Sequence, residues 1–445
     1  MKIKVMFLIL CFSFCFANSK DVFASSDQQI DLLLKSEVDI VQVKDIIMQM
    51  NPELEITVIP EINLLRISAS KDMDIERIFS NDIVKYYIED SVKLNPIIVE
   101  DIGIKNTIID GALSETRANM SAVEFFDKMA WHVDIITNNR KAIEISNGNG
   151  TNIALIDSGV DETHPILENK LNFDNAKSFI EGEEIKDISD RNGHGTMVAG
   201  NIAQIAPGAV ITPYKVISEK SGDSIWLVQA LIQAVKDKCD IINMSLGTFK
   251  STDVTDDVLT INAFQRAVDY ANSEGLIIVA AAGNYGFDLD KSLNDEKKLY
   301  LPGCLEGVVN VSSEHKNELS SYSDYGSSIQ FTAPGGDIVL IDGNVDASQL
   351  IYCIYPTYMD NGLSSSGIPQ GYTFSYGTSL SSAEVSASLA DVLAFYKKES
   401  LQIVSDKIVS ALAEGCTDLG KTGYDSYFGN GLLNLEKSLN LIIFK

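Results

Sequence analysis

The 445-residue chain is poor in basic residues. It has 35 lysines and arginines against 62 aspartates and glutamates, a formal net charge of −27. Such a charge disfavours nucleic acid or an anionic membrane surface as a partner. It favours solubility, and it either attracts basic peptides or simply solvates the surface. Hydrophobic residues make up 45% of the chain, which is ordinary for a globular protein of two or three domains.

The chain lacks a long apolar run beyond its N-terminus. Two lysines precede 13 uncharged, mostly apolar residues from Val5 to Ala17, which is too short for a mature membrane-spanning helix. This pattern is typical of a secretory signal peptide, and Val22-Phe23-Ala24 offers a cleavage site after Ala24. We therefore expect a signal peptide over residues 1–24 and release of the protein outside the cell without a stable membrane anchor.

Cysteine and histidine are scarce, and neither forms a metal-binding pattern. The chain has four histidines, no paired-cysteine metal spacing and no His-Glu-x-x-His sequence, which disfavours zinc-dependent hydrolysis. An even number of cysteines in an exported protein permits disulfides, but apolar, strand-like surroundings favour buried free thiols for two of them, Cys239 and Cys304. The cysteines beyond the signal segment are Cys239, Cys304, Cys353 and Cys416.

After the signal segment, residues 25–90 have the pattern of a small α+β unit. Apolar residues have helical spacing from Ser36 to Met50, and a short helix is expected at residues 74–79. Residues 91–122 show little pattern, which is typical of a linker. Strands of the small unit are expected at residues 54–59, 64–69 and 84–90.

From residue 123 onward, strand-like and helical segments alternate. This alternation predicts parallel pairing in a doubly wound α/β sheet with helices on both faces. The segment 276–281 is apolar on both faces, as a sheet covered on both sides requires. Strands are expected at residues 152–156, 210–216, 241–246, 276–281 and 308–311. Helices are expected at residues 194–205, 225–236, 261–272 and 379–396.

Three short motifs place glycine near a residue with catalytic chemistry, in the order aspartate, histidine, serine. Each residue alone has an ordinary explanation, because a strand-end aspartate forms turns and a serine caps helices. Together they fit one reaction, since a serine hydroxyl needs a base and the base needs an orienting anion. We therefore predict Ser379 as nucleophile, His194 as general base and Asp157 as orienting carboxylate. The motifs are Ile156-Asp157-Ser158-Gly159, Asn192-Gly193-His194-Gly195-Thr196 and Tyr376-Gly377-Thr378-Ser379.

These motifs resemble those of the subtilisin-like serine proteases, and the resemblance covers most of the chain. It implies a serine endopeptidase whose catalytic domain, residues 123–445, has a subtilisin-like, mostly parallel sheet. It also implies that residues 25–90 are an inhibitor- and chaperone-like propeptide, an unrelated small domain being the alternative, and that residues 91–122 contain a maturation site. The expected partners are a peptide or modified-peptide substrate and the propeptide, and the enzyme is expected to be a monomer.

The resemblance also implies roles for residues around the three motifs. Asn284, in Ala281-Ala282-Gly283-Asn284, would donate a hydrogen bond to the oxyanion formed during the reaction. Ser245, Leu246 and Gly247 would pair with the substrate backbone as a neighbouring strand does.

Tyr300 would lie at or near the floor of the primary specificity pocket. A tyrosine there would shrink the pocket, so we expect no strong preference for arginine before the cleaved bond. Asp295 and Glu296 lie close in sequence and offer an acidic alternative.

The chain departs from the family pattern in two places. Ala383 replaces the proline usual four residues after the nucleophile and is followed by Glu384, and Ala387 stands where glycine is common. These changes concern helix packing rather than proton transfer. The segment from Asn201 to Pro207 is too short for the calcium-binding loop of many relatives. We expect that no cofactor is required, calcium being possible without the usual tight site.

A narrower resemblance is to the leader peptidases of lantibiotic clusters. It rests on the Trp131-containing segment 127–137, the Ser379-Leu380 pair, the signal and propeptide, and the overall size. It implies removal of the leader from an exported lantibiotic precursor, with a general degradative or housekeeping exported subtilase as the alternative. A catalytically silent binding protein on a protease scaffold is a third hypothesis. It would require a lost triad member, and none is lost.

Overall fold

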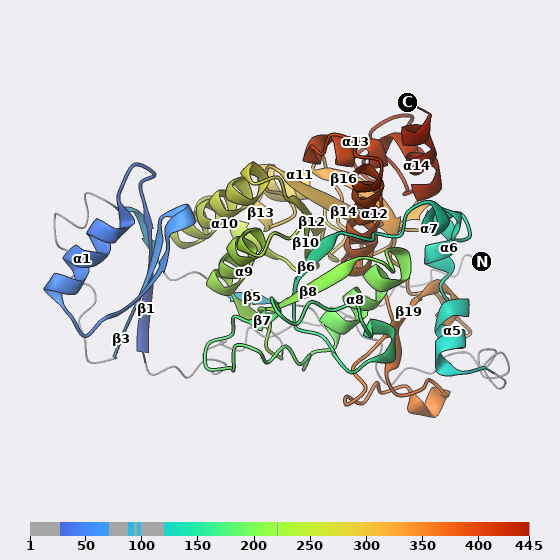
Figure 1. Cartoon of the computed structure of the whole chain (residues 1–445), viewed down its shortest axis with the longest axis horizontal. Coiled ribbons are helices and arrows are strands. Elements are labelled where there is room, and N and C mark those ends of the chain that lie inside the picture. The colour runs from blue at the N-terminus through green and yellow to red at the C-terminus, as the bar shows by residue number, and fades with distance from the viewer. Residues whose placement is uncertain (1–26, 71–87, 93–95, 99–119, 220, 445) are drawn as a thin grey trace, which may run out of the picture.

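The computed structural model describes residues 27–70, 88–92, 96–98, 120–219 and 221–444. Within these ranges the chain forms a small N-terminal unit and a larger α/β domain (Figure 1). The expected signal peptide, the expected helix at residues 74–79 and most of the expected linker lie outside the described residues.

The N-terminal unit is an antiparallel sheet with strand order β2-β3-β1-β4, covered on one face by α1. The first strand, β1, is not predicted by the sequence analysis, because Leu32-Leu33-Leu34 lacks alternation. Leu32 and Leu34 pack under α1, whereas Leu33 faces the larger domain, so both faces of this strand are apolar. The elements are β1 (Asp27–Leu34), α1 (Ile40–Met50), β2 (Glu55–Ile59), β3 (Leu64–Ser70) and β4 (Ile88–Val92).

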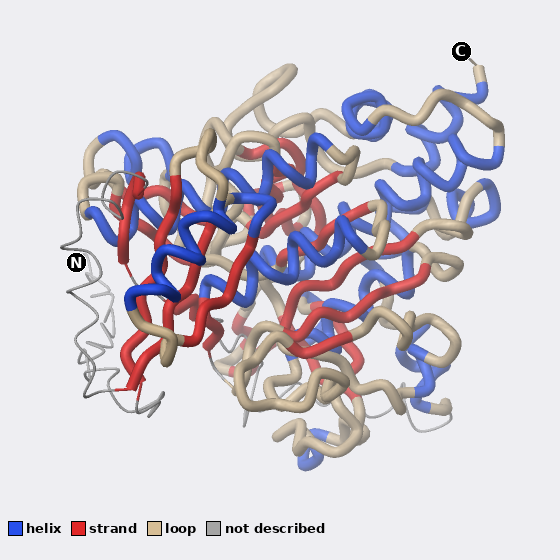
Figure 2. The backbone as a smooth tube through the Cα atoms, turned by 60° about the vertical axis from the view of Figure 1, so that its left-hand side comes forward, coloured by secondary structure: helices blue, strands red, loops and turns tan. Residues whose placement is uncertain are grey.

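The larger domain is built on an eight-stranded sheet with the order β15-β14-β12-β10-β6-β8-β7, in which β16 also pairs with β14. Every pairing is parallel except the one between β14 and β15, which confirms the predicted doubly wound, mostly parallel sheet. Figure 2 shows strands lying side by side with helices packed across them. The strands are β6 (Asn152–Asp157), β7 (Lys177–Ser178), β8 (Val210–Lys215), β10 (Ile241–Met244), β12 (Ile277–Ala281), β14 (Val308–His315), β15 (Glu318–Leu319) and β16 (Ile329–Pro334).

Helices cover both faces of this sheet. On β6, Ile153 and Leu155 share a hydrophobic core with α8 and α12, whereas Ala154 and Ile156 share the opposite core with α9 and α10. Alternate side chains of one strand thus enter two cores. The helices are α8 (His194–Ile205), α9 (Ser224–Lys236), α10 (Thr255–Ser273) and α12 (Thr378–Lys398).

Helix α10 begins six residues before the predicted start at residue 261. Its first turn contains Asp256 and Asp257, whose negative charge suits a helix N-terminus but interrupts the apolar periodicity used for prediction.

Shorter elements surround this core. Helices α5, α6 and α7 precede the first strand of the large sheet, and α13 and α14 pack beside α12. The helices are α5 (Ala122–Lys128), α6 (Trp131–Thr137), α7 (Lys141–Ile145), α11 (Leu289–Asn294), α13 (Ser405–Gly415) and α14 (Leu435–Ile443). The two-stranded sheets are β5 (Pro96–Ile98) with β9 (Ser221–Asp223), β11 (Thr248–Ser251) with β13 (Lys298–Leu301), β17 (Leu340–Ile341) with β18 (Asn344–Val345), and β19 (Ile351–Ile354) with β20 (Tyr372–Ser375).

The N-terminal unit lies against α9 and α10, on one flank of the larger domain (Figure 1). The face of its sheet opposite α1 supplies Leu33 and Leu64 to the core formed with these helices. Arg266 of α10 donates hydrogen bonds to the carbonyl oxygens of Leu34 and Ile62, at 2.7 and 3.1 Å. The two units are therefore joined by both apolar packing and polar contacts.

The described part of the chain contains no helix long and apolar enough to cross a bilayer. Its four cysteines, Cys239, Cys304, Cys353 and Cys416, are free thiols, and all but Cys304 are buried. Burial raises the pKa of the Cys239 thiol to about 12, which keeps it protonated and unreactive.

Candidate active site

The three predicted catalytic residues lie at the carboxyl edge of the parallel sheet. Asp157 ends β6, His194 begins α8, and Ser379 is the second residue of α12. Ser379 is tied to the neighbouring strand, because its Oγ donates a hydrogen bond to the carbonyl oxygen of Ser245, just beyond the end of β10, at 3.1 Å. β10 pairs directly with β6, so the three helix and strand ends meet at one edge.

Asp157 and His194 form a close pair. Asp157 Oδ1 lies 2.7 Å from His194 Nδ1, and the two residues are 1% and 2% exposed. An ionised carboxylate only accepts hydrogen bonds, so Nδ1–H donates to it. Nε2 is then the ring nitrogen that can accept a proton from a nucleophile.

Asp190 holds the loop before His194, a role that the sequence analysis does not identify. This buried carboxylate accepts hydrogen bonds from the backbone N–H groups of Asn192, Gly193 and Thr196, and from the hydroxyls of Ser158 and Thr196. Its complete burial raises its pKa, although these bonds favour the charged form. The spacing Asp190-x-Asn192-Gly193, typical of a turn in which a carboxylate accepts the following N–H groups, is the available sequence signal.

The side chain of Ser245 contacts the backbone of the predicted nucleophile, Ser379. Its hydroxyl donates to the carbonyl oxygen of Ser379 at 2.8 Å and lies 2.9 Å from Ser382 Oγ. The Ser245 side chain therefore faces α12 rather than solvent, and Leu246 is also buried. The predicted pairing of residues 245–247 with a substrate accordingly concerns their backbone groups and stays a prediction.

Tyr322 positions the turn that leads into α12. Its hydroxyl accepts a hydrogen bond from Gly377 N at 2.9 Å and donates to the carbonyl oxygen of Gly335 at 2.9 Å. Gly377 has a φ of 138°, a backbone conformation that side chains with a Cβ rarely adopt. Nothing in the local sequence pattern distinguishes Tyr322 from the other 15 tyrosines, so only the structure reveals this contact.

Asn284 lies beside the residue preceding the nucleophile. Its Oδ1 accepts hydrogen bonds from Thr378 N and Thr378 Oγ1, both at 2.9 Å. Because Oδ1 is held as an acceptor, the amide nitrogen is the group left to donate to an oxyanion. Asn284 follows β12, the neighbour of β10, so this donor lies at the same sheet edge as Ser379.

Tyr300 fills the space between the two glycine-bearing segments of the site. A Cβ on Gly247 would lie only 2.4 Å from the Tyr300 hydroxyl, and one on Gly283 would lie 3.2 Å from its ring. The ring is 6% exposed and packs edge-on against Phe249, with centroids 4.9 Å apart. Of the two acids considered as alternatives, Glu296 pairs with Lys298 at the surface. The structure thus places an aromatic ring between Gly247 and Gly283.

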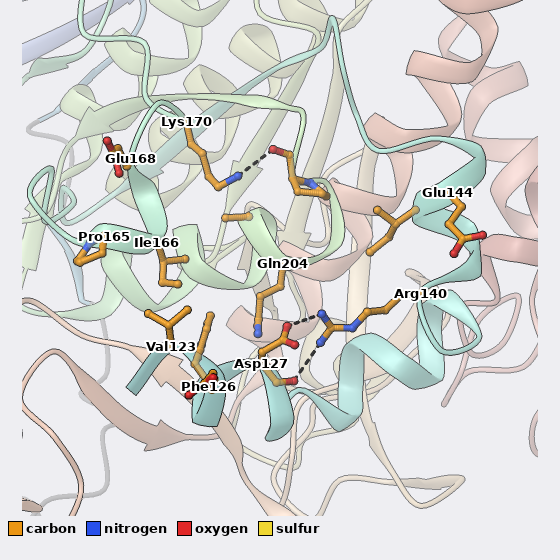
Figure 3. A pocket seen from close by; sticks show the side chains of 14 residues that line it. Val123, Phe126, Asp127, Arg140, Glu144, Pro165, Ile166, Glu168, Lys170 and Gln204 are labelled. Carbon is orange, nitrogen blue, oxygen red and sulfur yellow. Dashed lines mark hydrogen bonds and ion pairs between the residues drawn. The ribbon is translucent and has the colours of Figure 1, made fainter. Parts of the chain in front are cut away.

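A pocket of about 720 Å³ borders the C-terminal end of α8, where the calcium loop of relatives would begin (Figure 3). Gln204 points from α8 into this pocket, and Asp127 there is paired with Arg140. Lys170 adds a second positive charge and donates to the carbonyl oxygen of Pro207 at 2.8 Å. Calcium needs six to eight oxygen ligands, several of them carboxylates.

Three glutamates, Glu124, Glu144 and Glu168, also line this pocket, but Arg140 is paired with Asp127 and Lys170 adds a second positive charge, which disfavours a tight calcium site. Across the described ranges, no three His, Cys, Asp or Glu side chains are grouped closely enough to hold a metal ion. The independence of the enzyme from calcium stays a prediction.

Comparison with known proteins identifies the family. The profile of the subtilase family, peptidase S8, matches residues 148–431, which is more than half of the chain and includes the whole site. The chain is 28% identical to the epidermin leader peptide-processing serine protease EpiP of Staphylococcus epidermidis, over 98% of this chain and 99% of that protein. It is 27% identical to the nisin leader peptide-processing serine protease NisP of Lactococcus lactis, over 64% of this chain and 46% of that protein.

Solved structures give the same result. The crystal structure of a lanthipeptide protease matches with a TM-score of 0.67 and 35% identity, over 71% of this chain and 95% of that one. The structure of EpiP from Staphylococcus aureus matches with a TM-score of 0.74 over 94% of this chain and 99% of that one, and at 24% identity it supports the fold. The chain therefore belongs to the subtilase family of serine proteases.

Proposed function

We propose that this subtilase is an exported endopeptidase that removes the leader peptide from a lantibiotic precursor. The observation that carries the proposal is similarity over nearly the whole chain to a protease named for leader-peptide processing. The similarity includes the N-terminal unit as well as the catalytic domain, unlike the matches to subtilisins, which cover about 65% of the chain. The Asp157–His194 pair and Ser379 provide the groups needed for peptide-bond hydrolysis.

In the proposed reaction, Ser379 Oγ attacks the carbonyl carbon of the scissile bond. Its proton passes to His194 Nε2, and Asp157 stabilises the imidazolium through the 2.7 Å hydrogen bond to Nδ1. His194 then gives this proton to the leaving amine, which departs as the C–N bond breaks. Water hydrolyses the resulting ester, with His194 again accepting the proton, and Ser379 is regenerated.

Asn284 stabilises the negative charge that develops on the carbonyl oxygen. Its Oδ1 is already bound to Thr378, so its amide nitrogen is oriented before substrate arrives. Such preorganised donors act because no reorientation is needed when charge develops in the transition state.

The substrate would bind as an extended strand against the backbone of Ser245, Leu246 and Gly247. Tyr300 limits the depth of the primary pocket between Gly247 and Gly283. A long basic side chain therefore gains little from this pocket, and shape selects the residue that precedes the cleaved bond.

The N-terminal unit would act as a propeptide. It packs on α9 and α10, and the segment that follows it supplies β5, which pairs with β9 of the catalytic domain. We infer that a signal peptide over residues 1–24 directs export and that self-cleavage within residues 91–122 releases the enzyme as a monomer. Arg117, a candidate cleavage position, lies outside the described residues.

The proposal is tested by incubating the mature enzyme with a lantibiotic precursor that carries its lanthionine rings, and with unfolded casein at equal mass. Mass spectrometry should show one cut between leader and core peptide and little casein digestion. Digestion of casein into many short peptides at a comparable rate would favour a general degradative subtilase. No cleavage of either substrate, with parent and Ser379→Ala alike, would favour a silent binding protein.

A further inference from the structure

Strand β9 is an edge strand beside the catalytic residues. The segment leading into it starts at the triad, because Val216 N donates to the carbonyl oxygen of Asp157 at 2.8 Å. It then passes the loop before His194, where Asn192 Nδ2 donates to the carbonyl oxygen of Glu219 at 2.6 Å. Within the described residues, β9 pairs only with β5. Removal of the N-terminal region would thus expose a strand edge next to the reacting groups, which is a template for an extended peptide.

Asp223, the last residue of β9, is held by an arginine of the N-terminal unit. Arg66 Nη1 and Nη2 donate to the two carboxylate oxygens of Asp223 at 3.0 and 3.1 Å. The Arg66 residue is 5% exposed, and the Asp223 side chain is 14% exposed. A bidentate pair of this kind is among the stronger and more directional side-chain contacts.

Arg66 does not need Asp223 for its own neutralisation. Its Nε and Nη2 also donate to Asp31, the cross-strand neighbour on β1, at 2.7 and 2.8 Å. Asp31 is fully buried and belongs to the same unit, so this pair stays together when the unit leaves. When the N-terminal unit leaves, Asp223 therefore loses its ion-pair partner, Arg66.

Helix capping does not require the charge of Asp223 either. Asp223 is the N-cap of α9, and its Oδ1 accepts a hydrogen bond from Ile225 N at 3.0 Å. Asparagine caps helices as well as aspartate does. The negative charge at this position is therefore not explained by the local fold.

We propose that Asp223 is a cation-recognition residue of the peptide-binding groove, occupied by Arg66 in the precursor and by a basic substrate side chain in the mature enzyme. The inference rests on the proposed function, since it requires release of the N-terminal unit and entry of a peptide beside β9. The antiparallel register pairs Asp223 with residue 96 and Ser221 with residue 98. A substrate residue in the place of residue 96 would be the direct cross-strand neighbour of Asp223, within reach of a lysine or arginine.

The test uses peptides of one sequence in which a single lysine replaces norleucine, position by position, before the cleaved bond. When the lysine stands opposite Asp223, mature parent enzyme should cleave that peptide with a kcat/KM about threefold to fivefold higher than the norleucine peptide. This is the gain expected for one ion pair at the rim of a groove. Asp223→Asn should lose this preference at that position alone and keep the helix cap. Asp223→Glu should retain it.

A matched control is Glu219→Gln, which removes one negative charge from the exposed segment just before β9. It should leave the position-specific lysine preference unchanged. A lysine-to-norleucine ratio that is the same in parent and Asp223→Asn at every position would overturn the inference. Cleavage of the norleucine peptides by the parent reports the proposed endopeptidase function separately, because it does not depend on a charge at Asp223.

Discussion

His132 Nδ1 lies 2.6 Å from Glu384 Oε1, and both side chains are fully buried between α6 and the nucleophile helix α12. Burial lowers the pKa of His132 to about 3, with the charge of Arg140 a lesser cause. Burial, reinforced by Glu314, raises the pKa of Glu384 well above its usual range. The pair is therefore a neutral hydrogen bond in which the protonated Glu384 donates to His132.

This contact explains the departure at Glu384 that the sequence analysis notes. The residue follows Ala383 in α12 and fastens the helix that begins at Ser379 to the Trp131-containing segment. Trp131 makes a second contact from α6, donating from Nε1 to the carbonyl oxygen of Leu350 at 3.0 Å. The departure concerns helix packing, as expected.

Glu384→Gln should remove a loss of stability that Glu384 causes in the parent as pH rises. In the parent the pKa of Glu384 is raised in the folded state. As pH rises above about 5, Glu384 therefore ionises in the unfolded state before it does so in the folded state, and this ionisation stabilises the unfolded state. The parent should therefore lose stability relative to Glu384→Gln between about pH 5 and pH 8. Denaturant unfolding across this range measures the difference.

The same comparison has an internal control. Glutamine can still donate to His132 Nδ1, whereas Glu384→Ala leaves that buried nitrogen without a donor. The alanine variant should lose about 1–3 kcal/mol of unfolding free energy for this reason alone. Parallel pH profiles for parent and Glu384→Gln would show that Glu384 is ionised in the folded protein.

Two substitutions in the site should have unequal effects on peptidase activity. Ser379→Ala removes the nucleophile and should lower kcat/KM by several orders of magnitude in a protein that still folds. Asn284→Ala removes one oxyanion donor and should cost about 10²- to 10³-fold in kcat. Steady-state kinetics on one peptide measures both, with thermal unfolding as the check on folding. Equal activity of Ser379→Ala and parent would disprove the triad assignment.

Maturation should depend on the same serine. Expressed in an isolated system, Ser379→Ala should accumulate as a precursor that lacks only the signal peptide, whereas the parent should begin between residues 91 and 122. N-terminal sequencing and intact mass decide between these forms. Active parent enzyme that begins at Ser25 would contradict self-removal of the N-terminal unit.

Tyr300 should limit the side chain accepted before the cleaved bond. In a peptide library, the parent should show no dominant arginine at this position, because the Tyr300 ring fills the space between Gly247 and Gly283. Tyr300→Gly should increase cleavage after long side chains, and Tyr300→Asp should introduce a preference for arginine. A parent profile dominated by arginine would place the floor of the pocket elsewhere.

Removal of calcium should leave activity and thermal stability nearly unchanged. Only residues 206–209 connect α8 to β8, which leaves no room for a calcium-binding loop, and Arg140 and Lys170 line the neighbouring pocket. Measurements with excess chelator, compared with millimolar calcium, test this. A large loss of stability on chelation would reveal a calcium site formed by other residues.

Local sequence determined much of the catalytic domain. The bounds of α8, at residues 194–205, coincide with the prediction. Gly193 marks the start of the helix, and the apolar periodicity begins in the residues that follow it. The predicted triad rests on local sequence for the same reason, since each member has its own glycine-bearing motif. Strands such as β6 and β12 were predictable because burial on both faces requires a continuous apolar run.

Only the tertiary structure decided the contacts between residues far apart in the chain. His132 and Glu384 are separated by 252 positions and Arg66 and Asp223 by 157, so no local pattern links them. Their chemistry depends on burial, which determines whether a carboxyl group carries a proton or forms an ion pair. The strand β1 was missed for a related reason, because its second apolar face is explained only by packing of the N-terminal unit against α9 and α10.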